Sequence, residues 1–81
     1  MIESQKIGEY LIARHLGNVG KTNVWTVDNT SGQFLGSVKW YSPWRQYCFF
    51  IANGLVLNNR CMNDIKNFLD KCNEEHSDVC D

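Results

Sequence analysis

The strongest pattern along the chain is a run of apolar residues at helical spacing between residue 58 and about residue 75. On a helical wheel of about 100° per residue, one face collects the apolar side chains of Cys61, Met62, Ile65, Phe68, Leu69 and Cys72. The opposite face is polar, and Asn58 stands where a helix needs an N-cap acceptor. The pattern predicts an amphipathic helix over residues 58–75, followed by a frayed acidic tail at 76–81.

Two runs upstream of this helix favour β-strands. Residues 22–28 (TNVWTVD) and 34–41 (FLGSVKWY) are rich in β-branched and aromatic side chains. The segment between them, DNTSGQ, supplies the Asp, Asn, Ser and Gly residues that are typical of a turn. Together they predict a β-hairpin.

A third strand follows. Pro43 ends the second run, because proline cannot donate a backbone hydrogen bond to a sheet, and it suits the second position of a turn that begins at Ser42. The run at 47–52 (YCFFIA) is then the third strand, and an Asn-Gly pair turns the chain toward the helix. We expect one small α+β domain: a three-stranded antiparallel meander within residues 22–57, closed by the C-terminal helix (β-β-β-α).

Within the amino-terminal segment, residues 1–21, the first 18 residues support two interpretations. A short helix would be capped by Ser4 and end at Gly17, with apolar residues one turn apart inside it. An edge strand is the alternative, because Gly8 weakens a helix and apolar side chains alternate after it. We favour the helix.

Aromatic side chains are concentrated in WYSPWRQYCFF, residues 40–50, which holds six of them. Successive strand residues point to opposite faces, so Trp40 and Tyr41 lie on different sides of the sheet, as do the two adjacent phenylalanines. One helix covers only one face. The other face is therefore covered by residues 1–18, by another copy of the chain, or by a target, because large exposed apolar patches are uncommon on monomers.

Charge limits the range of partners. Eight Lys and Arg residues stand against nine Asp and Glu residues, for a formal net charge of −1. Non-specific nucleic-acid binding usually rests on a basic surplus. The balance excludes a general polyanion binder.

The expected location is the cytoplasm. The first ten residues, MIESQKIGEY, lack the basic and apolar regions of a secretory signal, and no window approaches the ~18 apolar residues of a membrane span. Disulfides are rare in the cytoplasm, so we expect the four cysteines to be reduced thiols, with Cys61 and Cys72 as small core residues.

Catalytic and metal sites fit the sequence poorly. Cys72, His76 and Cys80 follow at four-residue spacing, but zinc ligands must converge within about 2.0–2.3 Å of the ion, which positions spread along one helix do not. Neither His15 nor His76 is placed beside a nucleophile. The GNVGKT segment lacks the spacing of a phosphate-binding loop. We expect no enzyme, no metal and no cofactor.

Three stretches together carry a resemblance: VWTV, LGSVKWYSPWRQYCFF and CMNDIKNFL. They resemble a pattern found in short uncharacterised proteins of bacteriophages and bacterial mobile elements, in which a W-Y-x-P-W-R-Q-Y-x-F-F core recurs. The resemblance covers about residues 22–70 and implies a shared fold, and host-cell cytoplasm as the location if the chain is phage-encoded. The resemblance implies no particular activity. Such sequences often have proline after the F-F pair, where this chain has Ile51.

The SPWRQ turn is the predicted centre of a binding surface. Functional residues concentrate on loops, and tryptophan and arginine dominate binding hot spots. We expect the partner-binding residues to be Trp44, Arg45, Tyr41, Tyr47 and Lys39.

Two functions suit such a surface. The first is a small non-catalytic binding module that docks on a host protein and modulates it, for example as an inhibitor. The second is a single-stranded nucleic-acid binder that stacks bases on the exposed rings while Lys39 and Arg45 meet phosphates. The near-neutral charge favours the first, and a homodimer is compatible with either.

Overall fold

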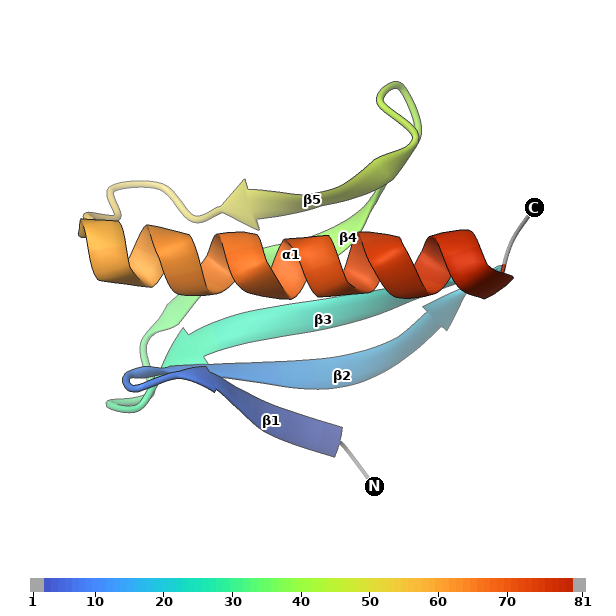
Figure 1. The fold of residues 1–81 in the computed structure, drawn as a ribbon. Coiled ribbons are helices and arrows are strands. Elements are labelled where there is room, and N and C mark those ends of the chain that lie inside the picture. The colour runs from blue at the N-terminus through green and yellow to red at the C-terminus, as the bar shows by residue number, and fades with distance from the viewer. Residues whose placement is uncertain (1–2, 80–81) are drawn as a thin grey trace.

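The computed structural model describes residues 3–79, with side chains described over residues 4–76. The described residues form a five-stranded antiparallel sheet in the order β1-β2-β3-β4-β5, and one helix lies across one face of it (Figure 1). The elements are β1 (Glu3–Gly8), β2 (Leu11–Val19), β3 (Thr22–Asn29), β4 (Phe34–Tyr41), β5 (Gln46–Ile51) and α1 (Asn59–Val79).

The expected fold class is right, but the expected three-stranded sheet is wrong. The favoured amino-terminal helix does not form, because β1 and β2 make a hairpin that extends the sheet beside β3. Leu11 and Ala13 are buried under α1, whereas Arg14 on the other face of β2 is exposed. This alternation is the period of a strand, and it places the side chains of Leu11 and Ala13 in the core.

The other elements lie close to their predicted positions. β4 has the predicted bounds, β3 extends through Asn29, and β5 begins at Gln46. Asn58 is the N-cap of α1, as predicted, because its Oδ1 atom accepts a hydrogen bond from the Cys61 backbone N–H at 2.9 Å. The helix continues to Val79, so residues 76–79 are helical where a frayed tail was expected; residues 80 and 81 lie outside the described residues.

The core lies between α1 and one face of the sheet. Strand residues Ala13, Val27 and Val38 are fully buried there, against the helix residues Ile65, Phe68 and Cys72. The ring of Phe68 meets that of Trp25 edge to face, with centroids 5.2 Å apart. Met62, at the margin of the predicted apolar stripe, is half-exposed.

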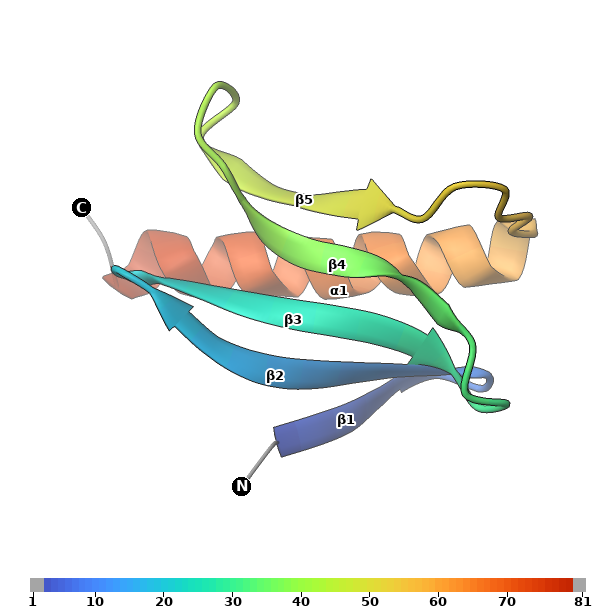
Figure 2. The ribbon, with the colours of Figure 1, turned by 180° about the vertical axis from the view of Figure 1, so that it is seen from behind.

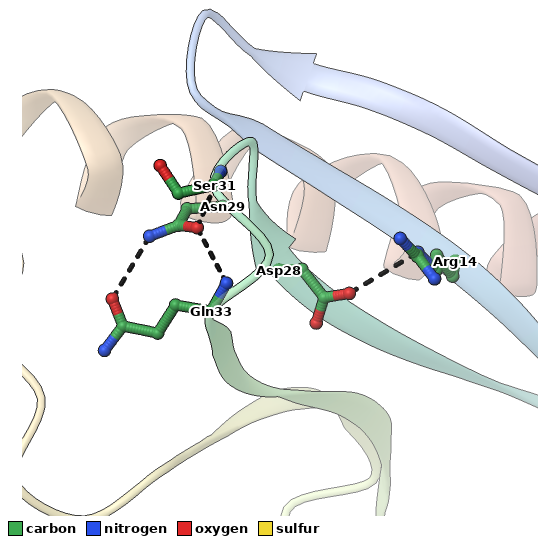
Figure 3. A network of polar contacts seen from close by, with 5 residues as sticks. All are labelled: Arg14, Asp28, Asn29, Ser31 and Gln33. Atoms are coloured by element: carbon green, nitrogen blue, oxygen red, sulfur yellow. Dashed lines mark hydrogen bonds and ion pairs between the residues drawn. The ribbon is translucent and has the colours of Figure 1, made fainter.

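The DNTSGQ turn between β3 and β4 is held by one side chain (Figure 3). The Oδ1 atom of Asn29 accepts hydrogen bonds from the backbone N–H groups of Ser31 at 3.0 Å and Gln33 at 2.9 Å. Such a side-chain turn is the reason that asparagine favours this position. Beside it, Arg14 of β2 pairs with Asp28 of β3, with 3.4 Å between Nε and Oδ2.

The second face of the sheet is open. Figure 2 shows this face with α1 behind the strands and no helix or strand in front of them. A row of directly paired residues crosses it, from Arg14 through Thr26 and Ser37 to Phe50. Of the three expected covers for this face, the amino-terminal segment is ruled out over its described residues from Glu3 onward, because they extend the sheet instead. The described residues contain no helix whose length and hydropathy suit a membrane crossing.

Candidate partner-binding surface

The hairpin of β4 and β5 projects beyond the body of the sheet. β3 and β4 are paired only as far as Trp25 and Val38, whereas the pairing of β4 with β5 continues to Tyr41 and Gln46. The tip of this hairpin is the loop at the upper right of Figure 1. The SPWRQ turn therefore stands clear of the neighbouring strands.

The turn is closed by backbone hydrogen bonds. The Arg45 N–H is shared between the carbonyl oxygens of Tyr41 at 2.9 Å and Ser42 at 3.1 Å. The second of these bonds makes Pro43 the second residue of a turn that begins at Ser42, as predicted. Arg45 has a φ of 53°, which lies in the left-handed region that favours glycine. An arginine there costs the fold of the order of 1 kcal/mol or more, and such residues concentrate at functional sites.

On the open face, the hairpin carries a cluster of rings and one cation. Tyr41 contacts Trp44 edge to face, with centroids 5.0 Å apart, and Phe50 at 5.9 Å. The Nζ atom of Lys39 lies 4.6 Å from the centre of the Phe50 ring, within cation–π range. We call these four residues, Lys39, Tyr41, Trp44 and Phe50, the open-face cluster. Trp44 is 67% exposed, although its indole packs against the ring of Tyr41.

The structure brings three of the five predicted residues together, namely Lys39, Tyr41 and Trp44. Arg45 is next to Trp44 but turns toward the helix side of the hairpin, where it lines a shallow cavity of about 240 Å³ with Trp40 and His76. It is exposed at the tip but does not share the open face.

Tyr47 lies on the opposite side of the sheet from the open-face cluster. It is 4% exposed, and its hydroxyl oxygen accepts a hydrogen bond from the Asn23 backbone N–H at 3.0 Å. Its own backbone N–H donates to Oδ1 of Asn73 on α1 at 2.7 Å, and its ring meets Trp40 at 5.5 Å. Tyr47 therefore joins β5 to the helix and the core, and the structure does not bring it to the predicted surface.

Phe50 is the residue that the sequence interpretation missed. It lies on the open face because the register pairs Tyr41 with Gln46, and residues 46, 48 and 50 then share the face of Tyr41. The face depends on the length of the loop between the strands. The observed loop, residues 42–45, places Phe50 on the face of Tyr41, whereas the loop of one more residue that the sequence predicted would have placed Tyr47 there.

The described residues hold no group of three or more His, Cys, Asp or Glu side chains placed to bind a metal ion. Cys48, Cys61 and Cys72 are free thiols, and Cys80, the third residue of the weighed zinc set, lies outside the described residues. Burial raises the pKa of the Cys72 thiol to about 11, with a smaller contribution from Glu75. A thiol with a raised pKa is protonated at neutral pH and is a poor nucleophile.

A partly enclosed cavity lies at the end of the molecule where β2 turns into β3. It measures about 180 Å³, and its lining mixes the rings of Trp25 and Tyr47 with Lys21, Glu75 and His76. Pockets for drug-sized ligands are usually about 300 Å³ or larger. This cavity is smaller than that, and we take the exposed open-face cluster as the candidate functional site.

Comparison with known proteins finds a similarity to a phage protein. No protein-family model matches the chain, and no solved structure matches it. A protein of Acholeplasma phage L2, described as an uncharacterized 9.3 kDa protein, is 37% identical over 41 residues. The match covers 51% of this chain and spans about half the length of the phage protein, 53% of it. The chain is thus similar to a small phage protein.

Proposed function

We propose that this chain is a small non-catalytic module that binds a protein through the open-face cluster, and that the partner is a host protein which the docking modulates. The observation that carries the proposal is Trp44, a tryptophan 67% exposed at the tip of a projecting hairpin and supported by Tyr41. The similarity to a phage protein supports a host cell as the setting.

The energetics of the cluster suit a docking anchor. An exposed indole loses apolar contact with water when a partner covers it, and tryptophans in this role are worth about 2 kcal/mol or more each. The contact of Trp44 with Tyr41 limits the conformations that the indole side chain adopts before binding. Less side-chain freedom is then lost on association, and the loss typically costs about 0.5–1.5 kcal/mol per side chain that binding immobilises.

Arg45 adds a second argument. It occupies a left-handed position at which glycine would be less strained, so the backbone conformation does not favour an arginine there. A charged, exposed side chain next to Trp44 extends the contact area toward the helix side of the hairpin. The pairing of tryptophan with arginine matches the composition of binding hot spots.

The geometry of the rings argues against base stacking. Tyr41 meets both Trp44 and Phe50 at steep angles, 85° and 71°, so the three rings form no flat platform for successive bases, and Lys39 lies over the ring of Phe50. On the same face, Arg14 is paired with Asp28 and so offers phosphates less charge. These contacts favour a protein partner over a nucleic acid.

A capture experiment tests the proposal. Immobilised parent protein is exposed to an Acholeplasma cell lysate, captured proteins are identified by mass spectrometry, and binding is repeated with the purified partner. The double variant Trp44→Ala, Arg45→Ala should keep its circular dichroism spectrum and lose at least about thirtyfold in affinity, which corresponds to ~2 kcal/mol. Phe34→Ala is the matched control, because Phe34 is 51% exposed at the other end of β4.

Two results would overturn the proposal. One is a folded double variant that binds every partner of the parent with unchanged affinity. The other is binding of a fluorescent single-stranded oligonucleotide that weakens steeply as salt is raised and that is lost in the double variant, which would indicate the nucleic-acid function instead.

A further inference from the structure

The two edges of the sheet differ in how they are protected. β1 carries Lys6 and has an irregular register between Lys6 and Gly8, and both features discourage pairing with another strand. β5, with the sequence QYCFFI, has no charged residue and no proline, and its register with β4 is regular. An apolar edge without charge or proline, in a sheet whose other edge is protected, is suited to pairing with another strand.

The register shows which backbone groups of β5 are open. The Ala52 N–H donates to the Leu35 carbonyl at 2.9 Å, so the even-numbered residues of this region bond to β4 and the odd-numbered residues point outward. At Tyr47 the outward N–H and C=O are both occupied by the side-chain amide of Asn73, at 2.7 and 3.4 Å. Within the described residues, the outward groups of Phe49 and Ile51 bond to no neighbouring strand.

An apolar groove of about 320 Å³ runs beside these open groups. It is lined by Phe49 and Ile51 of β5, Leu57 of the connection, and Met62, Ile65 and Leu69 of α1. Lys66 stands in its lining, but the ammonium group is 2.8 Å from the Asp70 carboxylate. A strand added to β5 would place alternate side chains in this groove without burying an unpaired charge.

We infer that β5 pairs antiparallel with β5 of a second copy, around a two-fold axis, to form one continuous sheet. The composition of the strand favours this occupant: two copies of an uncharged strand meet with no like charges opposed, and each supplies the apolar residues at alternate positions that the groove requires. The guarded edge of β1 stops further addition, so the assembly closes at two copies. The inference does not rest on the proposed function.

The contact of Asn73 with Tyr47 fixes the register. A two-fold axis at Phe49 would require the backbone groups of Tyr47, which Asn73 already occupies. An axis at Phe50 instead pairs Phe49 of each copy with Ile51 of the other, and it uses all of the open groups. In this register Phe50 lies directly opposite the second copy's Phe50 on the open face, so the two open-face clusters become neighbours.

The first test measures mass against concentration by light scattering or sedimentation. The parent should rise from the 9.4 kDa of one chain toward twice that value, and Ile51→Lys should stay at 9.4 kDa with an unchanged circular dichroism spectrum. Val56→Lys is the matched control, because Val56 is 92% exposed and lies off the edge, and it should dimerise like the parent. Trp44→Ala should also dimerise, which separates this inference from the proposed function.

The second test checks the register by oxidative cross-linking with diamide. Directly opposed residues of this kind have Cα atoms about 4.5 Å apart, which a disulfide can bridge, so Cys48→Ser, Phe50→Cys should give a covalent dimer. The parent should give none through Cys48, because the two copies of Cys48 would be about 13 Å apart along the strands. A parent that stays at one chain mass, a mass that grows beyond two chains, or an uncrosslinked double variant would each overturn the inference.

Discussion

Replacement of Phe68 by alanine should destabilise the fold by about 3–5 kcal/mol, the usual cost of deleting a buried ring. Phe68 is 5% exposed and, with Ile65 and Cys72, is one of the buried residues through which α1 meets the sheet. The loss includes its edge-to-face contact with Trp25, a kind of pair worth about 0.5–1.5 kcal/mol beyond burial alone. The remainder is apolar contact with the core and the cavity that alanine would leave.

The size of this loss matters because the domain is small. A chain of this length has a free energy of unfolding of roughly 4–12 kcal/mol, so Phe68→Ala removes about a quarter of it or more. The melting temperature should fall by at least about 12 °C, since each kcal/mol shifts it by about 4–8 °C in a domain of this size.

Thermal unfolding followed by circular dichroism measures this shift. Phe68→Leu keeps most of the apolar contact and should cost about 1–2 kcal/mol. Trp44→Ala removes a larger ring from an exposed position and should cost no more than about 0.5 kcal/mol. If Phe68→Ala melts within about 2 °C of the parent, α1 does not pack on the sheet through this side chain, and the core described above is refuted.

Two further predictions concern the packing of β4 and of α1. Gly36→Ala should cost about 1–3 kcal/mol in a denaturant titration, because an added Cβ atom would come within 2.5 Å of the Phe50 carbonyl oxygen and 2.6 Å of the Phe49 ring; an unchanged midpoint would contradict that close approach. Between pH 9 and about 11 the unfolded chain releases the Cys72 proton while the folded chain retains it, so stability should fall as pH rises through this window. Cys72→Ala should flatten that part of the melting curve against pH, and an identical slope in parent and variant would show that another group titrates there.

The sequence by itself determined the elements whose signals are local. The apolar stripe of α1, its cap at Asn58 and the turn around Pro43 each depend on residues within a few positions of one another, and each lies close to where the pattern predicts it. The sequence also predicts that adjacent rings in β4 and in β5 lie on opposite faces of the sheet, because neighbouring strand residues point to opposite faces.

Only the tertiary structure decided which face of the sheet is covered. Residues 3–19 carry weak signals for both helix and strand, and burial of Leu11 and Ala13 beneath α1 selects the strand. The same packing separates two similar tyrosines: Tyr47 faces α1 and joins the core, whereas Tyr41 faces outward and supports Trp44. Whether a strand residue faces the helix or the open side depends on the register of the sheet and on the position of a helix that is distant in sequence. Local sequence patterns contain neither piece of information.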